Sequence, residues 1–401
     1  MTVSQHRSVK GTPGMAEEQP LILFLDPMHH TPQYSIPLTK HLRDCGVSID
    51  RGWQSPLHGD AEPPEFEFLR LTFRCRHVLW RMSRSVWRMA RGMEYLYDLL
   101  RLKRFVRRRG YSIVHYNWLV VPALDLLFMR WLKKQHITVV VTVHNVKPHD
   151  SGRISEYLTY AYREADHLIT LSNHVKRMLI SEAGVLAAKI TIVPHGSLDG
   201  YMPKVPNVGK NVLPEWFPVN CPIVVCLGDI RPYKGVPDLL YAWAAVVREI
   251  PEARLVIAGR LRENCRAEVL SALKGLGGVA PTVFTEFKYL SRDKYQSYLQ
   301  AATVLGQPYR SASQSGNTVE AFVCGVPVVC TRVGGLPEMI IEGRTGAIAE
   351  PGDIGGLAGA IISVLRANAG GELAVYCKQL AEERASWDSI TRSILAVYSE
   401  Q

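Results

Sequence analysis

The sequence predicts an α/β protein of two doubly wound domains, each built on a parallel sheet with helices on both faces. Short apolar runs typical of buried strands, such as 138–143 and 223–228, alternate with helical segments along the chain. A chain of 401 residues has room for two domains of about 150 residues each. In such domains ligands bind beyond the carboxyl ends of the strands, so the residues that follow each strand are the first site candidates.

The composition agrees with a folded protein of the cytoplasm. Hydrophobic residues make up 47% and charged residues 21% of the chain, as in ordinary globular proteins. No apolar run reaches the roughly 18 residues of a membrane span, and the polar stretch 1–19 is expected to be a disordered tail rather than a signal peptide. The eight cysteines form no CxxC pair, which favours buried thiols in a reducing compartment over disulfides or a zinc site.

The first domain is expected to span 20–198. It opens with an apolar strand at 21–25, and the loop after that strand carries His29 and His30. Either histidine could contact an acceptor hydroxyl or a phosphate. The alternative is that both are ordinary polar residues of a loop.

The segment 70–109 carries an unusual charge. It has thirteen Lys or Arg residues against two acidic ones, and so accounts for the whole net charge of +10. Apolar residues, with Trp80 and Trp87 among them, recur through it at roughly helical spacing. A basic amphipathic helix with tryptophans favours a surface that lies on anionic lipid, and the alternative is a solvated helix whose apolar side packs in the domain core. No nucleic-acid-binding motif accompanies the charge, so nucleic acid is not an expected partner.

Two further histidines follow predicted strands of the first domain. His144 and Asn145 come directly after the strand 138–143, although a histidine there could equally serve as a cap or fill the core. His195 follows a strand near 190–193, where it could touch a ligand or only shape the turn. The next residues, 199–221, are rich in Pro, Gly and Asn without periodicity and are expected to link the domains.

The second domain is expected to span 222–385. Its first strand is followed by a glycine turn and by two cations, Arg231 and Lys234, ahead of a helix at 236–249. Arginine offers a fixed fork of donors and lysine a mobile point charge, so the pair could clamp a diphosphate. The alternative is an ordinary charged turn.

A second candidate for the same ligand lies at 313–337. Gly316, Asn317 and Thr318 form a turn that opens a short helix, and this helix carries Glu320. A helix start presents backbone N–H groups that suit phosphate. The Glu320 carboxylate could accept hydrogen bonds from sugar hydroxyls, as acidic residues do in dinucleotide-binding folds. Chemistry alone therefore suggests a nucleotide diphosphate, with an ordinary loop and helix as the alternative.

The run GNTVEAFVCGVPVVCTRVGGLPEMI, which begins at Gly316, resembles the donor-site signature of retaining GT-B glycosyltransferases of family four, a group active in bacterial polysaccharide and glycolipid assembly. The similarity is close over 222–352 and looser elsewhere. It implies the GT-B fold, in which two Rossmann-like domains face a central cleft. The first domain would bind the acceptor, the second would bind the nucleotide sugar, and a helix at 386–401 would return to the first domain.

The resemblance also implies a role for each candidate. The segment TVHNVKPHD resembles the post-strand histidine motif of the family, so His144 would be the catalytic residue that faces the transferred sugar. Glu320 would bind the ribose. The implied ligands of the diphosphate are Arg231, Lys234, Gly316, Asn317 and Thr318, and the implied base-binding loop is Lys288 and Tyr289.

One departure from the family concerns a pair of glutamates eight residues apart. Glu320 matches the second, and the first falls at Ala312, which cannot bond sugar hydroxyls. Ser311, Ser313, Gln314 or Ser315 is expected to take over, together with backbone amides. The loss leaves open two other interpretations, a GT-B sugar-nucleotide epimerase and a catalytically silent module that binds a sugar nucleotide or a glycan.

The expected function is that of a retaining glycosyltransferase. It would move a hexose of glucose or mannose type from a nucleotide-diphosphate sugar to a hydroxyl of a lipid-linked glycan acceptor. The sequence has no clustered Asp-x-Asp or histidine ligand set, so no metal and no cofactor besides the co-substrate is expected. The basic segment 70–109 predicts a peripheral position on the inner face of the cell membrane.

Overall fold

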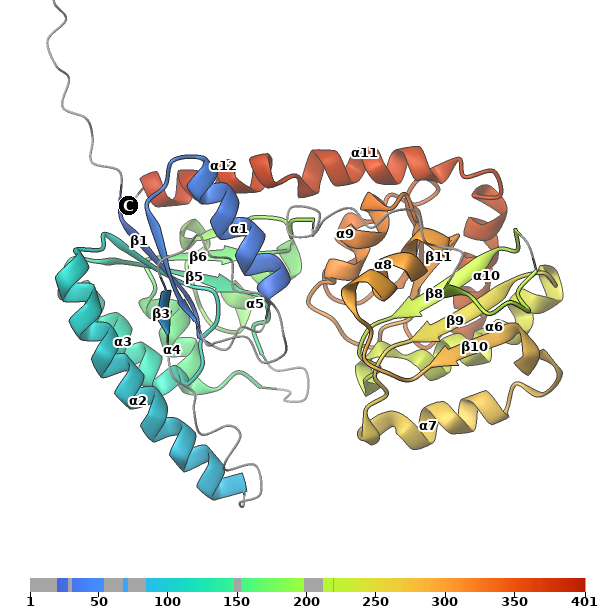
Figure 1. Cartoon of the computed structure of the whole chain (residues 1–401), viewed down its shortest axis with the longest axis horizontal. Helices are drawn as coiled ribbons and strands as arrows, with labels where there is room; N and C mark the ends of the chain where they lie inside the picture. The colour runs from blue at the N-terminus through green and yellow to red at the C-terminus, as the bar shows by residue number, and fades with distance from the viewer. Residues whose placement is uncertain are drawn as a thin grey trace, which may run out of the picture.

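The computed structural model describes residues 20–27, 31–53, 68–70, 84–147, 153–197, 212–218 and 220–400. Two parallel sheets, each covered by helices, stand side by side in Figure 1. The predicted architecture of two doubly wound α/β domains is therefore confirmed. The predictions for 1–19, for the loop with His29 and His30, and for Trp80 lie outside the described residues.

The first domain holds a seven-stranded sheet in the order β3-β2-β1-β4-β5-β6-β7. All described pairs in it are parallel. Its strands are β1 (Ile22–Asp26), β2 (Ile49–Trp53), β3 (Phe68–Arg70), β4 (Ile113–Tyr116), β5 (Thr138–Val143), β6 (His167–Thr170) and β7 (Ile190–Ile192). Its helices are α1 (Pro32–Asp44), α2 (Arg84–Arg109), α3 (Pro122–Lys133), α4 (Glu156–Glu164) and α5 (Asn173–Ser181).

The second domain holds a six-stranded parallel sheet in the order β10-β9-β8-β11-β12-β13. Its strands are β8 (Ile223–Leu227), β9 (Arg254–Ala258), β10 (Val283–Glu286), β11 (Val304–Gln307), β12 (Val328–Thr331) and β13 (Gly346–Ala349). The helices that follow are α6 (Val236–Glu249), α7 (Glu263–Lys274), α8 (Arg292–Ala301), α9 (Gly316–Val323), α10 (Ile354–Ala367), α11 (Leu373–Ala385) and α12 (Trp387–Ser399). Short 3₁₀ helices cover Pro232–Lys234 and Leu336–Met339.

The central strands are apolar because helices cover both faces of each sheet. In β8 every residue is buried, and β5 is buried from its second residue onward, as expected for parallel strands covered on both sides. The strand order reverses between β1 and β4 in the first sheet and between β8 and β11 in the second. Reversal points of this kind open a crevice beyond the strand ends, so the fold places one candidate crevice in each domain.

The helix α12 belongs to the core of the first domain although it follows the second domain in sequence. Its residues Ile390, Ile394 and Val397 are buried together with Ile22 and Phe24 of β1. Figure 1 shows α11 and α12 running in succession along one side of both domains. The chain therefore crosses back from the second domain to the first.

The described part of the predicted linker 199–221 packs onto the second domain. Phe217 and Cys221 are buried in the apolar cluster that also contains Ile223 of β8. Val212 and Leu213 pack against the same cluster. The second domain therefore includes residues that precede its first strand.

A buried carboxyl group joins α2 to α3. Asp125 is fully buried, and its Oδ2 accepts hydrogen bonds of 2.9 Å from the backbone amides of Val120 and Val121. Its other oxygen accepts a hydrogen bond from the hydroxyl group of Tyr95 in α2. Burial raises the pKa of Asp125 to about 7, although these hydrogen bonds act to lower it. The folded protein therefore holds a proton on this carboxyl group over a range of pH in which the unfolded chain does not.

This proton predicts a pH dependence of stability. Between pH 4 and 7 the unfolded chain has lost the Asp125 proton and the folded protein retains it, so the free energy of unfolding should fall as pH rises, by roughly 2–4 kcal/mol. An asparagine side chain at this position would keep an oxygen for the two amides and could donate to Tyr95, so Asp125→Asn should flatten this part of the profile. Urea unfolding of both proteins at several pH values measures the difference. Parallel profiles for the two proteins would show that Asp125 is not the titrating group.

Candidate functional site

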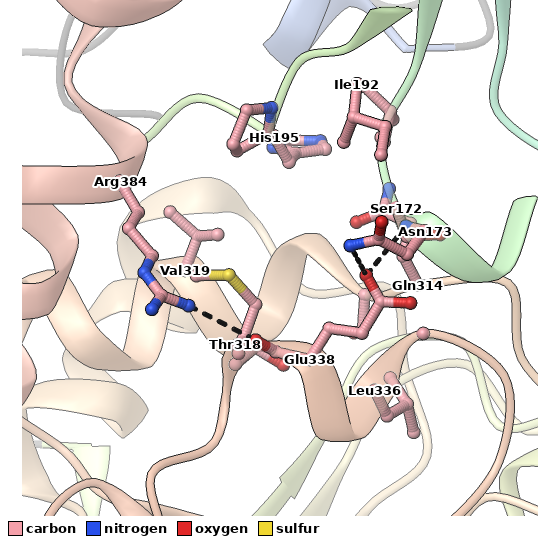
Figure 2. Close-up of a pocket in the computed structure, with 15 residues that line it drawn as sticks. Ser172, Asn173, Ile192, His195, Gln314, Thr318, Val319, Leu336, Glu338 and Arg384 are labelled. Atoms are coloured by element: carbon pink, nitrogen blue, oxygen red, sulfur yellow. Dashed lines mark hydrogen bonds between the residues drawn. The ribbon is translucent and has the colours of Figure 1, made fainter. Parts of the chain in front are cut away.

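Residues of both domains line a cavity of about 130 Å³ between them. Small-molecule sites commonly measure roughly 300–1,000 Å³, so this cavity accommodates only part of a large ligand. Figure 2 shows His195 and Ile192 of the first domain facing Thr318, Val319 and Glu338 of the second. The other lining residues are Leu171, Ser172, Asn173, Pro194, Gln314, Ser315, Gly335, Leu336, Met339 and Arg384.

The domains are joined beside this cavity by Glu338. Its two carboxylate oxygens accept hydrogen bonds of 2.7 Å from the backbone amides of Asn173 and His174, which open α5 in the other domain. Figure 2 shows the contact with Asn173. These amides have no partner within the helix, and the positive end of the helix dipole favours a carboxylate there. Arg384 donates to the backbone oxygen of Glu338 at 3.3 Å. The contact of the Glu338 carboxylate with the start of α5 fixes the orientation of the two sides of the cavity relative to each other.

The start of α9 lies on the second-domain side. Ser315 precedes the helix without a side-chain cap, and the side chain of Asn317 donates to the Leu227 oxygen at 3.2 Å. The Thr318 hydroxyl donates to Gln307 at 2.9 Å, so it is engaged inside the domain. The first backbone amides of α9, those of Gly316 and Asn317, are thus the groups suited to an anion.

Lys234 reaches the same place from the loop after β8. Its ammonium donates to the Leu227 oxygen at 3.4 Å and lies 4.9 Å from the centre of the Tyr309 ring. A Cβ on Gly228 would lie 3.3 Å from this ammonium and 3.7 Å from the side-chain nitrogen of Asn317. Gly228 therefore leaves room in front of both donors. Burial acts to lower the pKa of Lys234, but its neighbours, Tyr309 first, outweigh burial, and the pKa is raised.

Arg231 takes part in a cluster that the sequence did not predict. Asp229 accepts from Arg231 at 3.4 Å, from Arg260 at 3.2 Å and from both Nε and a terminal nitrogen of Arg262. Burial acts to raise the pKa of Asp229, but the arginines, Arg260 and Arg262, outweigh it and lower the pKa. Three guanidinium groups around one carboxylate leave a surplus of positive charge beside Gly228.

Glu320 lies inside the domain and is paired. Its side chain is 6% exposed, and its Oε2 accepts a hydrogen bond of 2.9 Å from Arg292 at the start of α8. Lys288 and Tyr289 precede that helix in an exposed loop, and Tyr289 is 79% exposed to solvent. The predicted ribose ligand and the predicted base loop are therefore connected through α8.

His144 lies at the end of β5 and is buried. Its Nε2 donates to the side-chain oxygen of Asn117 at 2.9 Å, and the Trp118 ring stacks on the imidazole at 4.5 Å. Thr31 accepts hydrogen bonds from both Asn117 and Trp118 at 3.1 Å. These three residues follow β4 and β1, so the first reversal point holds His144 in a fixed orientation. Asn145, next along, accepts at its backbone oxygen from Tyr162 at 3.3 Å.

His195 lies beside the start of α9 and has a tyrosine neighbour in common with His144. Its Nδ1 donates to the Gly196 oxygen at 2.7 Å, and its Nε2 would lie 3.2 Å from a Cβ on Gly316. Burial lowers the pKa of His195, so the ring is neutral. The Tyr34 ring contacts both histidines, with its centre 5.3 Å from each ring centre. The structure thus brings His144 and His195 into contact with one shared tyrosine.

The loop before α9 carries the remaining candidates. Gln314 and Ser315 line the cavity, and the Ser315 hydroxyl accepts from Gln307 at 3.1 Å. Ser313 is buried, and its backbone oxygen accepts from Gly335 at 3.0 Å. Ala312 packs in the apolar cluster of the second domain. A glutamate at this position would have to leave that cluster to reach the cavity.

Sequence reasoning missed several residues of the site. Arg292, Asn117, Trp118, Glu338 and Arg384 are common residue types that meet their partners only through the fold. Within the described ranges, no group of three or more His, Cys, Asp or Glu side chains could hold a metal ion. Over the same residues, no helix has both the length and the apolar character that crossing a bilayer requires.

Comparison with known families matches both domains. Residues 221–367 match a family described as glycosyl transferases group 1, and residues 38–197 match one described as glycosyltransferase family 4. The D-inositol 3-phosphate glycosyltransferase of Mycobacterium leprae is 31% identical over 241 residues, which are 59% of this chain and 54% of that protein. The protein of the same name from Mycobacterium tuberculosis is 32% identical over 240 residues, which are 59% and 48% of the two chains. The chain spans about half the length of the curated relatives it matches.

Solved structures share the arrangement of both domains. Sucrose-phosphate synthase from Thermosynechococcus elongatus superposes with a TM-score of 0.74 at 20% identity, covering 95% of this chain and 99% of its own. Anabaena HepE in complex with UDP superposes with a TM-score of 0.70 at 17% identity, covering 95% and 100%. These likenesses establish the fold, and the two family matches cover one domain each. This chain belongs to the family-four glycosyltransferases and has the GT-B fold.

Proposed function

We propose that the protein transfers a hexose from a nucleotide-diphosphate sugar to an acceptor hydroxyl. One observation carries this proposal, the convergence of donors for an anion at the reversal point between β8 and β11. The first amides of α9, the ammonium of Lys234 and the open space at Gly228 meet there. Glu320 lies one turn into the same helix, where a ribose attached to the bound diphosphate would be within its reach.

The chemistry proposed for this site needs no protein nucleophile. Among the described residues that line the cavity, the one carboxylate is that of Glu338, and it is bound to the amides of α5. Lys234 and the α9 amides would stabilise the leaving diphosphate as the glycosidic bond loosens. The acceptor hydroxyl would attack from the same face and give its proton to a leaving phosphate oxygen, so the configuration of the sugar would be retained. The same groups would take the place of a metal ion.

The identity of the donor is also a proposal. HepE has been solved with UDP and with UDP-glucose, which makes UDP-glucose the first donor to test. The curated relatives are named as D-inositol 3-phosphate glycosyltransferases. From these names we carry over only the class of acceptor, which is a hydroxyl of a small polyol or of a glycan. The specific acceptor that we propose is a lipid-linked glycan.

Calorimetry with UDP, ADP, GDP and their glucose and mannose conjugates tests the donor site. Wild type should bind the nucleotides of one base. Glu320→Ala should weaken that binding by about tenfold, because charged hydrogen bonds to the ribose are lost. Asp293→Ala, an exposed carboxylate on α8, serves as the matched control and should bind as wild type. If no nucleotide binds wild type, the donor site is assigned wrongly and the proposal fails.

A silent binding module is the second candidate function, and Ala312 favours it. The family places a sugar-binding glutamate at this position, and here the side chain is packed in the core. Turnover separates the two functions. Release of nucleotide diphosphate in the presence of an acceptor identifies a transferase, whereas tight binding without release over a panel of acceptors identifies a silent module.

We propose further that α2 rests on an anionic membrane. Met89 and Met93 are 61% and 62% exposed, and Leu96 and Leu100 continue the same apolar stripe at 47% and 54%. The opposite face of the helix, with Tyr95 and Leu99, is buried in the first domain. Exposed arginines follow at Arg104, Arg107, Arg108 and Arg109. Figure 1 shows α2 on the outside of its domain, and apolar side chains beside basic ones suit a lipid headgroup region.

Vesicle flotation tests this surface. The double variant Arg104→Glu/Arg108→Glu should lower binding to vesicles with phosphatidylserine at least about tenfold, since each basic residue contributes about 1 kcal/mol near an anionic surface. Arg101 and Arg107 are left unchanged because they contact Asp98 and Trp131. The matched control reverses two exposed charges on α7, Arg266→Glu/Lys274→Glu. Equal flotation of all three proteins, or none by wild type, would contradict membrane binding through α2.

A further inference from the structure

Arg292 is a partly buried cation that contacts Glu320 in the proposed donor site. It opens α8, directly after the loop that carries Lys288 and Tyr289, and its side chain is 18% exposed. Its terminal nitrogen donates to Glu320 Oε2 at 2.9 Å. The two residues lie 28 positions apart in the sequence and meet only because α8 packs near α9. Among the described acidic side chains, Glu320 is the one that forms an ion pair with Arg292.

The pair answers an electrostatic problem of this site. A buried carboxylate loses most of its hydration, and its negative charge would oppose the arrival of a diphosphate near the start of the same helix. A guanidinium in contact with the carboxylate offsets both effects. It also fixes the orientation of the carboxylate, because a hydrogen bond to one oxygen directs the remaining lone pairs.

The tyrosine next to this pair carries no charge. Tyr295 lies one turn further along α8. Its burial, together with the negative charge of Glu320, raises the pKa of this phenol well above its usual value. Tyr295 therefore stays neutral, and Arg292 alone supplies the compensating charge from this helix.

We propose that Arg292 is a positioning residue which orients the Glu320 carboxylate toward the ribose hydroxyls of the donor and so sets the preference for ribonucleotides over 2′-deoxyribonucleotides. This inference rests on the proposed function, because it needs a nucleotide whose ribose lies at Glu320. With Arg292 in place, the carboxylate is held where it can accept from the ribose hydroxyls. Without it, the carboxylate loses the donor that fixes its orientation, and the loss of one hydroxyl from the ligand matters less.

The helix α8 offers a matched control two residues away. Lys294 forms an ion pair of 2.6 Å with Glu286 at the end of β10. Lys294→Met therefore removes a cation and an ion pair from the same helix without touching Glu320. Arg292→Met removes the positioning cation, and Arg292→Lys keeps the charge but loses the planar fork of donors.

The experiment compares ribose and deoxyribose ligands in each protein. Calorimetry measures the dissociation constants of UDP, ADP and GDP and of their 2′-deoxy forms for wild type, Arg292→Met, Arg292→Lys and Lys294→Met. Wild type and Lys294→Met should prefer the ribonucleotide of the bound base by about tenfold, the value expected for a hydroxyl bonded to a charged acceptor. The preference should fall to about twofold in Arg292→Met, and Arg292→Lys should lie between.

The outcomes separate this inference from the function on which it rests. Ribonucleotide binding by wild type with an unchanged preference in both Arg292 variants overturns the positioning role and leaves the donor site in place. An equal loss of preference in Lys294→Met also overturns it, because the effect would then belong to the stability of α8. Absence of binding to wild type overturns the donor site and this inference together. If Arg292→Met does not fold, Arg292→Lys decides, and a preference at least about threefold below wild type supports the proposal.

Discussion

Replacing Lys234 by alanine is expected to lower the rate of sugar transfer by about a hundred- to a thousandfold. The ammonium lies against the Leu227 oxygen and the Tyr309 ring, in front of the space that Gly228 leaves open. In the proposed mechanism, the ammonium stabilises the negative charge that develops on the leaving diphosphate. Its effect should therefore appear mainly in kcat, with a smaller change in the affinity for the donor.

Steady-state kinetics with the donor identified by calorimetry measures this effect. Lys234→Arg should recover part of the rate because it retains a cation, and Lys274→Ala on the exposed end of α7 should leave the rate unchanged. Since the pKa of Lys234 is raised, the rate should show no loss from its deprotonation up to about pH 9. An alanine variant with a nearly normal rate would remove Lys234 from the mechanism.

Gly235, the next residue, holds this loop in place. Its φ of 61° lies in the left-handed region, and a Cβ would lie 1.9 Å from the backbone oxygen of Pro308 after β11. Only glycine therefore lets the β8 loop approach β11 this closely. The position of the Lys234 ammonium depends on that approach.

Replacing Trp387 by alanine is expected to destabilise the first domain by about 3–5 kcal/mol, the usual effect of deleting a large buried aromatic side chain. Trp387 opens α12 and is 5% exposed. Its ring stacks on His41 at 5.4 Å, contacts Tyr34 at 6.1 Å and donates to the Ser197 oxygen at 2.7 Å. One side chain thus joins the crossing helix, α1 and the segment after His195.

Urea unfolding of Trp387→Ala gives the free energy, and the KM for the donor gives the effect on the site. Tyr34 contacts both His144 and His195, so the loss of its neighbour should also raise KM. Trp216→Ala is the matched control, because Trp216 is 53% exposed and should cost less than about 1 kcal/mol. A loss of stability no larger than that of the control would mean that α12 is held by its other residues alone.

The sequence predicted the sheets well because their strands are locally marked. Runs such as 138–143 and 223–227 are apolar, rich in β-branched residues and followed by turn residues. His144 and the start of α9 could be found for the same reason, since each directly follows such a run or opens a helix. Whether these residues carry the proposed roles stays a prediction.

The partners of these residues could not be predicted in the same way. Asn117 and His144 are 27 positions apart, Arg292 and Glu320 are 28 apart, and Asn173 and Glu338 are 165 apart. Neither periodicity nor spacing connects such pairs, because their contacts depend on strand order and on how helices pack. The contacts of Asp229 with Arg260 and Arg262 could not be predicted either, because these arginines lie after β9, the strand next to β8 in the sheet.

The place of α12 in the fold bears on how the protein is made. His115 of β4 bonds to Tyr398 of α12 at 2.6 Å across 283 residues of sequence, and α12 supplies part of the first core. During synthesis, therefore, the amino-terminal domain emerges from the ribosome with one face of its sheet covered by α1 but not yet by α12. The second domain completes its own core with α10 and α11, which directly precede α12, so neither core is complete until these three helices have been made. Until then the part of the first sheet that α12 covers is a surface on which chaperones are expected to act.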